Sequence, residues 1–228
     1  GAFVHAQNGS ASFSDTTIDN NTASAWGGLY LDARSGSASF TDSSISGNTA
    51  AGSFGGAYVV AYNCSASFSD TTIDNNTANS GSYGGLYLDA RFGSASFTDS
   101  SISGNTAAGS NGGAYVHAYN GSASFSDTTI NNNTASGGSF GGLFLNTQNG
   151  SASFTDSSIS GNYAAVSYGG AYVHVYNGSA SFSGSTIDNN TANSGSYGGL
   201  YLFAANGSAS ITDSSISGNS ARLDHGGL

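Results

Sequence analysis

A glycine pair that recurs at a fixed interval constrains the fold of this chain more than any other sequence feature. The pairs begin at residues 27, 55, 84, 112, 141, 169, 198 and 226, so spacings of 28 and 29 residues alternate. The underlying unit is therefore a 57-residue double repeat, and the 228 residues hold four of them. A fixed period of this length is typical of a solenoid. Residues 1–228 are accordingly predicted to be a single repeat array, a segment of a longer one.

Each unit is predicted to contain three short strands separated by bends. In the first strand, alternation places Leu86, Leu88 and Ala90 on one face and Tyr87 and Asp89 on the other. The second strand has the sequence Ser-Ala-Ser-Phe in most units, and the third surrounds an isoleucine that occurs once in every unit. The inward face is thus apolar in all three strands.

Asn-Gly turns follow the first strand in five of the eight units and would ordinarily indicate β-hairpins. A hairpin arrangement would leave the third segment without a partner. Coiling the chain lets every strand pair with its own copy one turn later and satisfies the backbone groups. The sequence therefore predicts an all-β fold, a right-handed parallel β-helix of about eight coils of 28–29 residues. At a spacing of about 4.8 Å per coil, the rod would be about 38 Å long.

The bend after the isoleucine carries an asparagine at the same place in all eight units. The residue before it is always Asn or Gly, the two residues that best accept the left-handed backbone region. Stacked asparagines can pass amide hydrogen bonds from coil to coil. We therefore expect a structural ladder formed by Asn21, Asn48, Asn76, Asn105, Asn133, Asn162, Asn190 and Asn219.

The composition excludes several classes of protein. The net charge is −10, and its 13 acidic residues are all aspartates. Three arginines and no lysine cannot form a footprint for nucleic acid. The single cysteine excludes an internal disulfide framework, and no apolar run is long enough to span a bilayer.

The segment Ile-Ser-Gly-Asn-Thr-Ala-Ala-Gly-Ser-Phe-Gly-Gly-Ala-Tyr-Val, residues 45–59, resembles a known repeat. It is similar to the paired repeats of polymorphic outer-membrane proteins and related bacterial right-handed β-helix surface proteins, in which [FI]-x-x-N-x-A precedes G-G-A-[ILV]. The resemblance recurs along the whole chain. It implies a secreted or cell-surface adhesin or an autotransporter passenger, and this sequence departs from the family pattern in showing no membrane barrel or signal peptide among the residues given and in being more regular.

One aspartate follows the second strand in seven of the eight units. A row of carboxylates could bind Ca²⁺, which prefers hard oxygen ligands. Alternatively each carboxylate caps its own turn through backbone N–H groups, and one carboxylate per coil is a sparse ligand set. No metal or other cofactor is therefore predicted, and the weak metal candidates are Asp15, Asp42, Asp70, Asp99, Asp127, Asp156 and Asp213.

Polysaccharide lyases share the β-helix fold, so catalysis has to be considered. A lyase needs an acidic metal cluster and a strong base in a cleft. Arg34 and Arg91 are equivalent positions two coils apart, and His5, His117 and His174 are also equivalent to one another. Residues that obey the repeat symmetry do not indicate a unique site. The sequence therefore predicts no catalytic residue and no enzyme activity.

Aromatic residues recur on the outward side of the first strand and just before the glycine pair. Two adjacent rows of exposed rings exceed what a soluble monomer usually shows. They could pack laterally or against sugars, or simply stabilise the strand by stacking. The predicted exposed aromatic ladder is Tyr30, Tyr58, Tyr87, Tyr115, Phe144, Tyr172 and Tyr201.

Asn-x-Ser/Thr sequences are frequent and all fall at predicted bends. They are acceptors if the chain passes a glycosylating compartment, but these residue types are also common in turns. The candidate positions are Asn8, Asn20, Asn63, Asn75, Asn120, Asn132, Asn149, Asn177, Asn189 and Asn206.

The leading functional hypothesis is a non-catalytic structural protein at the cell surface or outside the cell, a rod or filament segment of a fibre or adhesin. Its expected partners are further copies stacked end to end, because an open end coil exposes unpaired backbone groups. Glycans are the other expected partners, and nucleic acid is not expected. The alternative is a binding module with a repetitive face for glycans or ice. An outward lattice of Ser10, Ser12, Ser14 and their equivalents suggests ice binding, but such surfaces usually favour threonine.

Overall fold

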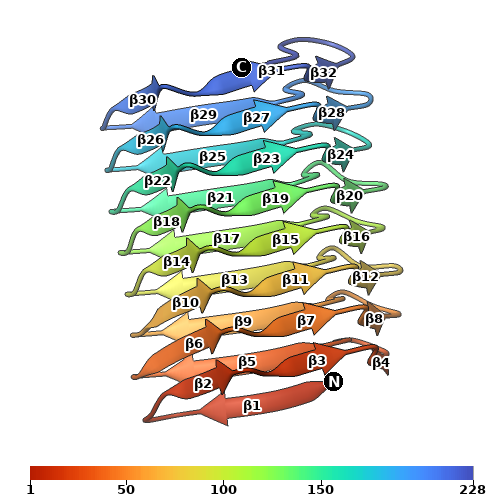
Figure 1. The fold of residues 1–228 in the computed structure, drawn as a ribbon, viewed down its shortest axis with the longest axis vertical. Helices are drawn as coiled ribbons and strands as arrows, with labels where there is room; N and C mark the ends of the chain where they lie inside the picture. The colour runs from red at the N-terminus through yellow and green to blue at the C-terminus, as the bar shows by residue number, and fades with distance from the viewer. Residues whose placement is uncertain (228) are drawn as a thin grey trace.

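The computed structural model describes residues 1–227, which form 32 β-strands and no helix. The strands build a parallel β-solenoid of eight stacked coils, with β1–β4 in coil 1, β5–β8 in coil 2 and so on to β29–β32 in coil 8 (Figure 1). The chain runs from left to right through β2 and β3 on the near side and returns along β5 on the far side while it rises, so the coil is right-handed (Figure 1). The predicted fold is therefore confirmed.

Four eight-stranded parallel sheets, here called A to D, run along the axis, and every coil gives one strand to each. Sheet A consists of β1 (Ala2–Ala6), β5 (Leu29–Arg34), β9 (Ala57–Tyr62), β13 (Leu86–Arg91), β17 (Ala114–Tyr119), β21 (Leu143–Gln148), β25 (Ala171–Tyr176) and β29 (Leu200–Ala205). Sheet B consists of β2 (Ala11–Ser14), β6 (Ser37–Thr41), β10 (Ser65–Ser69), β14 (Ala95–Thr98), β18 (Ala123–Ser126), β22 (Ala152–Thr155), β26 (Ala180–Ser183) and β30 (Ala209–Thr212).

Sheets C and D are built from shorter strands. Sheet C consists of β3 (Thr17–Asp19), β7 (Ser44–Ser46), β11 (Thr72–Asp74), β15 (Ser101–Ser103), β19 (Thr129–Asn131), β23 (Ser158–Ser160), β27 (Thr186–Asp188) and β31 (Ser215–Ser217). Sheet D consists of β4 (Thr22–Ala23), β8 (Thr49–Ala50), β12 (Thr77–Ala78), β16 (Thr106–Ala107), β20 (Thr134–Ala135), β24 (Tyr163–Ala164), β28 (Thr191–Ala192) and β32 (Ser220–Ala221).

The number of strands in a coil differs from the sequence-based prediction, which gave three rather than four. The fourth strand has only two residues, too few to show any alternation of apolar and polar positions. It forms because the chain remains extended after the asparagine bend and pairs in register, as Thr77 does with Thr106. The second residue of this strand is a small, buried alanine, such as Ala78, which fills the corner of the core.

The core consists of columns of identical or similar side chains. Phenylalanines of sheet B stack from Phe13 to Phe182 with ring centroids 4.2–4.8 Å apart and planes within 4° of parallel. Ile211 replaces the ring in coil 8. The isoleucines of sheet C and the Leu, Val and Ala side chains of sheet A fill the rest of the interior. Burying one such large side chain contributes about 1.5–3 kcal/mol, so the columns supply most of the stability.

The double repeat has a steric origin in the bend after sheet C. Asn75 of coil 3 adopts a positive φ of 54°, and Gly104 occupies the same place in coil 4 with a φ of 62°. A Cβ on Gly104 would lie only 2.7 Å from Asn75 Oδ1. The same relation holds between Gly47 and Asn20 of the preceding coil. An asparagine side chain in one coil therefore favours glycine at the same place in the next coil, which matches the period of two coils.

The recurring glycine pair lies where the chain passes over the asparagine column. A Cβ on Gly85 would lie 2.8 Å from Asn105 Cγ and 2.6 Å from the Gly113 carbonyl oxygen. No side chain fits into that space, which explains why this glycine recurs in every coil. The single extra residue of alternate coils falls in the loop before the pair, outside the core.

Candidate functional site

The predicted asparagine ladder lies in one buried column at the bend between sheets C and D. Asn105 Nδ2 donates to Asn133 Oδ1 of the next coil at 3.0 Å and to the Ile73 carbonyl at 2.9 Å. Its own Oδ1 accepts from Nδ2 and from the backbone N–H of Asn76, both at 3.0 Å. The same pattern runs from Asn21 to Asn219. The amides are thus satisfied only by their neighbours, which gives the column a structural role.

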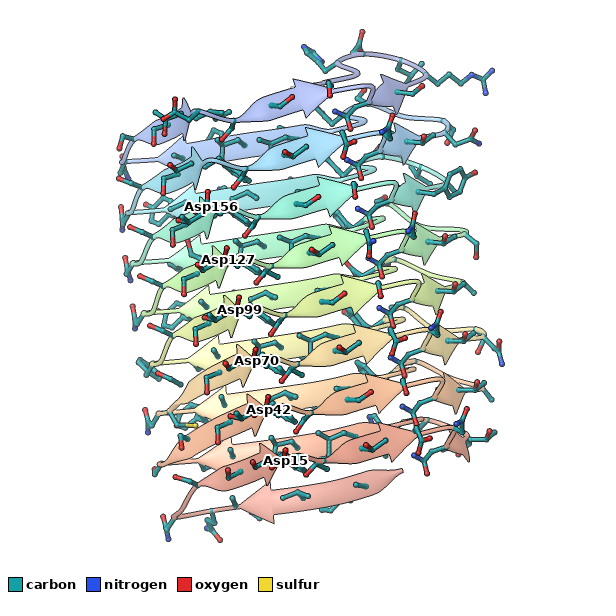
Figure 2. All side chains as sticks on the ribbon, viewed as in Figure 1. Asp15, Asp42, Asp70, Asp99, Asp127 and Asp156 are labelled. Carbon is teal, nitrogen blue, oxygen red and sulfur yellow. The ribbon has the colours of Figure 1, made fainter. Side chains whose placement is uncertain are left out.

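The seven aspartates of the candidate metal row lie on the bend after sheet B, and Figure 2 shows six of them, from Asp15 to Asp156, one above another. All are exposed and adopt positive φ values of 47–49°, and Gly184 takes the eighth place with a φ of 61°. Three of them accept hydrogen bonds from the preceding serine, as Asp70 does from Ser69 at 2.8 Å. No group of three or more metal-ligating side chains occurs within residues 1–227. The backbone conformation accounts for aspartate or glycine at this bend.

The predicted aromatic ladder lies on the outward face of sheet A, but its rings are half-buried rather than exposed. Adjacent rings stack face to face, as Tyr87 and Tyr115 do with centroids 5.0 Å apart and planes within 1°. A second row, which includes Phe54 and Tyr83, packs edge-on against the first. The faces are therefore covered by neighbouring rings, and this ladder offers mainly ring edges to solvent.

All ten candidate glycosylation asparagines are exposed. Several are hydrogen-bonded: Asn149 donates to Asn120 at 2.7 Å, Asn177 to Asn149 at 2.9 Å and Asn206 to Asn177 at 3.1 Å. These asparagines form a second, solvent-exposed ladder at the turn between sheets A and B. Asparagine tolerates the positive φ of this turn, so the residue type is explained without assuming that the side chains are glycosylated.

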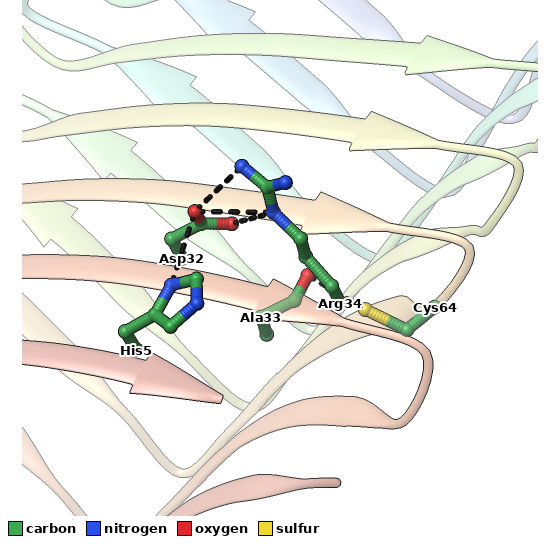
Figure 3. A network of polar contacts seen from close by, with 5 residues as sticks. All are labelled: His5, Asp32, Ala33, Arg34 and Cys64. Atoms are coloured by element: carbon green, nitrogen blue, oxygen red, sulfur yellow. Dashed lines mark hydrogen bonds and ion pairs between the residues drawn. The ribbon is translucent and has the colours of Figure 1, made fainter. Parts of the chain in front are cut away.

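Two clusters of charged residues on the outward face of sheet A were not predicted from the sequence. Asp32 lies between His5 of coil 1 and Arg34 of its own strand (Figure 3). His5 Nδ1 is 3.2 Å from Asp32 Oδ2, and Arg34 donates to both carboxylate oxygens through Nε and to Oδ2 through Nη2 at 3.0 Å. The carboxylate is thereby held in a fixed orientation beneath an exposed guanidinium.

Asp89 repeats this arrangement two coils further along. Arg91 Nε donates to Asp89 Oδ2 at 2.8 Å, and Arg91 Nη2 lies 2.7 Å from the same oxygen. Asp89 is only 2% exposed although alternation places it outward. Its Oδ1 accepts no hydrogen bond within the described residues, and His117 Nδ1 lies 3.3 Å away, at ion-pair distance. The carboxylate therefore lies beneath this surface, with Oδ1 against His117 and Oδ2 against Arg91.

The electrostatics follow from these contacts. Burial by itself raises the pKa of the Asp89 carboxyl, but the contact with His117 and the hydrogen bond and charge of Arg91 more than offset it, so the pKa is lowered. The hydrogen bond to Asp89 raises the pKa of Arg91. Burial raises the pKa of Tyr87 and Tyr115 beside the cluster. The carboxylate and the guanidinium are both charged at neutral pH.

The two clusters border a groove on sheet A. It encloses about 410 Å³ and is lined by the two Asp–Arg pairs together with Tyr30, Tyr58, Val60, Tyr62 and Tyr87. A second hollow of about 290 Å³ shares Tyr62 and Arg91 with the first and is further lined by Phe92, His117 and Tyr119. The groove, defined by these two hollows, therefore extends along the axis from coil 2 to coil 5.

Residues that depart from the repeat gather at this groove. The places of Asp89 and Arg91 are taken by Asn146 and Gln148 in coil 6. In coil 8 they are taken by Phe203 and Ala205. The sequence does contain a signal for the groove. At equivalent outward positions, the Asp–Arg pairs occur in only two of the four double repeats.

Two further departures lie at the turn beside the groove. Phe92 has a φ of 62° where coils 5 to 8 have asparagine, and it is 48% exposed. Cys64 replaces a turn glycine, is buried, and its Sγ contacts the Ala33 carbonyl oxygen at 3.4 Å (Figure 3). Burial raises the pKa of its thiol. The thiol is therefore a packing element below the groove wall.

Comparisons with known proteins give no match to a family model, to a curated protein or to a solved structure. The resemblance to surface-protein repeats therefore stays a prediction. Within residues 1–227 no helix is long and apolar enough to cross a membrane.

Proposed function

We propose that this chain is a non-catalytic rod, a structural segment of an extracellular fibre or surface adhesin. The observation that carries the proposal is the continuity of the interior: the asparagine column connects all eight coils, and the phenylalanine stack connects coils 1 to 7. Each coil is joined to the next by backbone pairing in four sheets. Such a molecule resists bending and stretching along its axis, as a spacer must.

A structural role also suits the charged clusters. Each arginine is committed to its own aspartate, and each aspartate is an ion-pair partner rather than a free base. A general base must be able to accept a proton near neutral pH, whereas the pKa of Asp89 is lowered. We expect no cleavage of linear polysaccharides incubated with the protein, measured by the appearance of new reducing ends or unsaturated products. Turnover that Asp89→Asn abolishes would contradict the proposal.

Stacking of coils along the axis extends the same proposal to a filament. In coil 8 the apolar side chain of Ile211 is 37% exposed, and β29–β32 each pair on one side only within the described residues. A further coil in register, from another copy, would cover Ile211 and pair the other edge of each strand. Open strand edges of this kind template self-association.

Electron microscopy of the purified protein at micromolar concentration tests this extension. We expect filaments whose diffraction shows a repeat of about 4.8 Å along the fibre axis. Ile211→Lys places a charge on the open end and should shorten the filaments, whereas Val166→Lys, on an exposed loop at the side, should not. Monodisperse particles of one chain at all concentrations would contradict end-to-end stacking.

An extracellular location and a surface-adhesin setting rest on the sequence resemblance and on the exposed glycosylation sequences. Mass spectrometry of the native protein tests this part: glycans on Asn63 or Asn177 would place the chain in a secretory route.

The groove on sheet A favours a second candidate function, ligand binding. Ice binding has weaker support, and freezing in the presence of the protein would reveal it as thermal hysteresis.

A further inference from the structure

We propose that the groove on sheet A binds a neutral glycan, an extended chain of hydroxyl-rich sugars that lies along the solenoid axis across coils 2 to 5. The proposal adds a ligand to the proposed rod. It does not depend on filament formation, because the groove lies on the side of the solenoid and is built within one chain.

The hydrogen-bonding groups of the groove match hydroxyls. A guanidinium has five N–H donors. Arg34 and Arg91 each direct Nε and Nη2 to an aspartate, which leaves the Nη1 donors available to a ligand. Asp32 and Asp89 line the groove and supply carboxylate acceptors beside these donors. A sugar hydroxyl both donates and accepts, so it can satisfy both kinds of group at once.

The charge balance favours a neutral ligand over an ion. Within the groove, two carboxylates offset two guanidinium groups, and each arginine lies against its aspartate. The chain as a whole carries −10, so its long-range field repels polyanions. A cation would have to displace the arginines from Asp32 and Asp89. A neutral polyhydroxyl chain meets neither obstacle.

The apolar walls fit the C–H faces of sugar rings. Tyr62 is 40% exposed and Phe92 is 48% exposed, and they meet edge to face with planes 81° apart. Neither ring is stacked in parallel with a neighbour, unlike the tyrosine ladder, and Phe92 also meets Tyr119 edge to face. Val60 lies in the middle coil between the two Asp–Arg pairs. This combination of apolar walls and a few fixed polar groups is typical of ligand sites.

The distance between the pairs sets the direction of the ligand. Equivalent residues two coils apart are separated by about 9.6 Å along the axis. A chain lying along the axis can contact Arg34 and Arg91 together, and it reaches Phe92 in the adjoining hollow. A ligand lying across the axis would contact only one pair. The groove thus selects an extended chain over a single sugar.

Backbone strain supports a role for Phe92. A bulky residue at a φ of 62° is unfavourable, and exposed aromatic rings gain little from folding. Asn120, Asn149, Asn177 and Asn206 hold the corresponding conformation with the residue type that accepts it best. Tyr168 and Tyr197 hold a similar φ but are half-buried, whereas Phe92 is exposed at the groove, where a ligand can cover its ring.

Calorimetric titration of the purified chain tests the proposal, with cellohexaose, mannohexaose, maltohexaose and chitohexaose as neutral probes and hexagalacturonate as the acidic probe. We expect at least one neutral hexasaccharide to bind, more tightly than its own disaccharide and with little dependence on salt. Binding of the acidic probe alone, or of none of the probes, would overturn the proposal.

Two variants borrow residues that the fold already accepts in coil 6. Asp89→Asn/Arg91→Gln and Phe92→Asn introduce the residues found at positions 146, 148 and 149, so both should fold. Each should weaken binding of the neutral hexasaccharide about tenfold, while Arg222→Gln on an exposed loop of coil 8 should leave it unchanged. Equal binding by all three variants would place the ligand elsewhere. Dimers in sedimentation that Phe92→Asn separates would assign the groove to a second copy of the chain and also overturn the proposal.

Discussion

The interior columns and the outward face of sheet A obey opposite rules, although both repeat once per coil. Inside, the asparagine column holds the same residue in all eight coils, and the phenylalanine column changes only at Ile211. Outside, the place of Asp89 holds His, Asp, Val, Asn or Phe in other coils. Backbone pairing is equally regular in both regions.

The difference shows what a solenoid demands of its sequence. In an interior column each side chain is the packing surface or hydrogen-bond partner of the next one, so a change affects two neighbours. On the outward face solvent can satisfy whatever a neighbour does not. Variation in stability should therefore concentrate inside, and variation in function should concentrate outside.

Truncation in the phenylalanine stack should have the largest effect. Phe125→Ala removes a ring that is stacked on Phe97 and Phe154 and leaves a cavity between them. We expect a loss of about 4 kcal/mol in the free energy of unfolding, measured in denaturant. Phe203→Ala on the exposed face of coil 8 is the outward control and should cost under about 1 kcal/mol. Similar losses of unfolding free energy for the two variants would contradict the difference between interior and outward face.

The asparagine column should come next. Asn105→Ala leaves the amides of Asn76 and Asn133 and the Ile73 carbonyl without their partner. We expect a loss of about 3 kcal/mol, because each buried polar group left unsatisfied costs about 1–3 kcal/mol. Asn79 is exposed, so Asn79→Ala serves as the control and should have the same melting temperature as the unmodified protein. An unchanged melting temperature for Asn105→Ala would mean that water replaces the amide.

The alternation of asparagine and glycine offers a smaller and sharper test. Gly104→Ala introduces a Cβ at a positive φ and 2.7 Å from Asn75 Oδ1, and we expect a loss of about 2 kcal/mol. Adding Asn75→Gly removes the clash and should recover about half of that loss. A double variant no more stable than Gly104→Ala alone would show that the backbone conformation, and not the neighbouring side chain, sets the two-coil period.

Acid titration should give the smallest difference, confined to the groove. The lowered pKa of Asp89 stabilises the folded state above the ordinary carboxyl pKa of about 3.9, and this contribution is lost as pH falls through the lower folded value. Asp89→Asn lacks it. The gap in unfolding free energy between the two proteins should thus be constant above about pH 5 and narrow below about pH 4. A gap that widens on acidification would contradict the assignment of charge at Asp89.

The sequence was sufficient for the fold because the interior is periodic. The spacing of the glycine pairs, the isoleucines and the asparagines defines coils whose equivalent residues stack in register. The fourth strand was missed because two residues carry no periodicity. The groove was missed because Arg34 and Arg91 look symmetric when compared with each other, and only Gln148 and Ala205 at the same place show that the pattern stops.

Burial could not be read from alternation either. Asp89 is outward by its place in the strand, yet Arg91 and His117 flank it and leave it 2% exposed. The burial of Asp89 depends on Arg91 from its own coil and His117 from the next coil, which together cover the carboxylate. The half-buried state of the tyrosine ladder has the same origin, since each ring is covered by the rings above and below it.

One variant tests directly whether scaffold and site are separable. It carries Asp32→Asn, Arg34→Gln, Asp89→Asn, Arg91→Gln and Phe92→Asn, so that coils 2 and 4 present the residues of coil 6. Calorimetry should show an unfolding free energy within about 1 kcal/mol of the unmodified chain, because both partners of each ion pair are removed together. Titration of the same sample with the neutral hexasaccharide should show at least a 100-fold loss of affinity. A collapse in stability, or retained binding, would contradict the separation of a structural interior from a binding face.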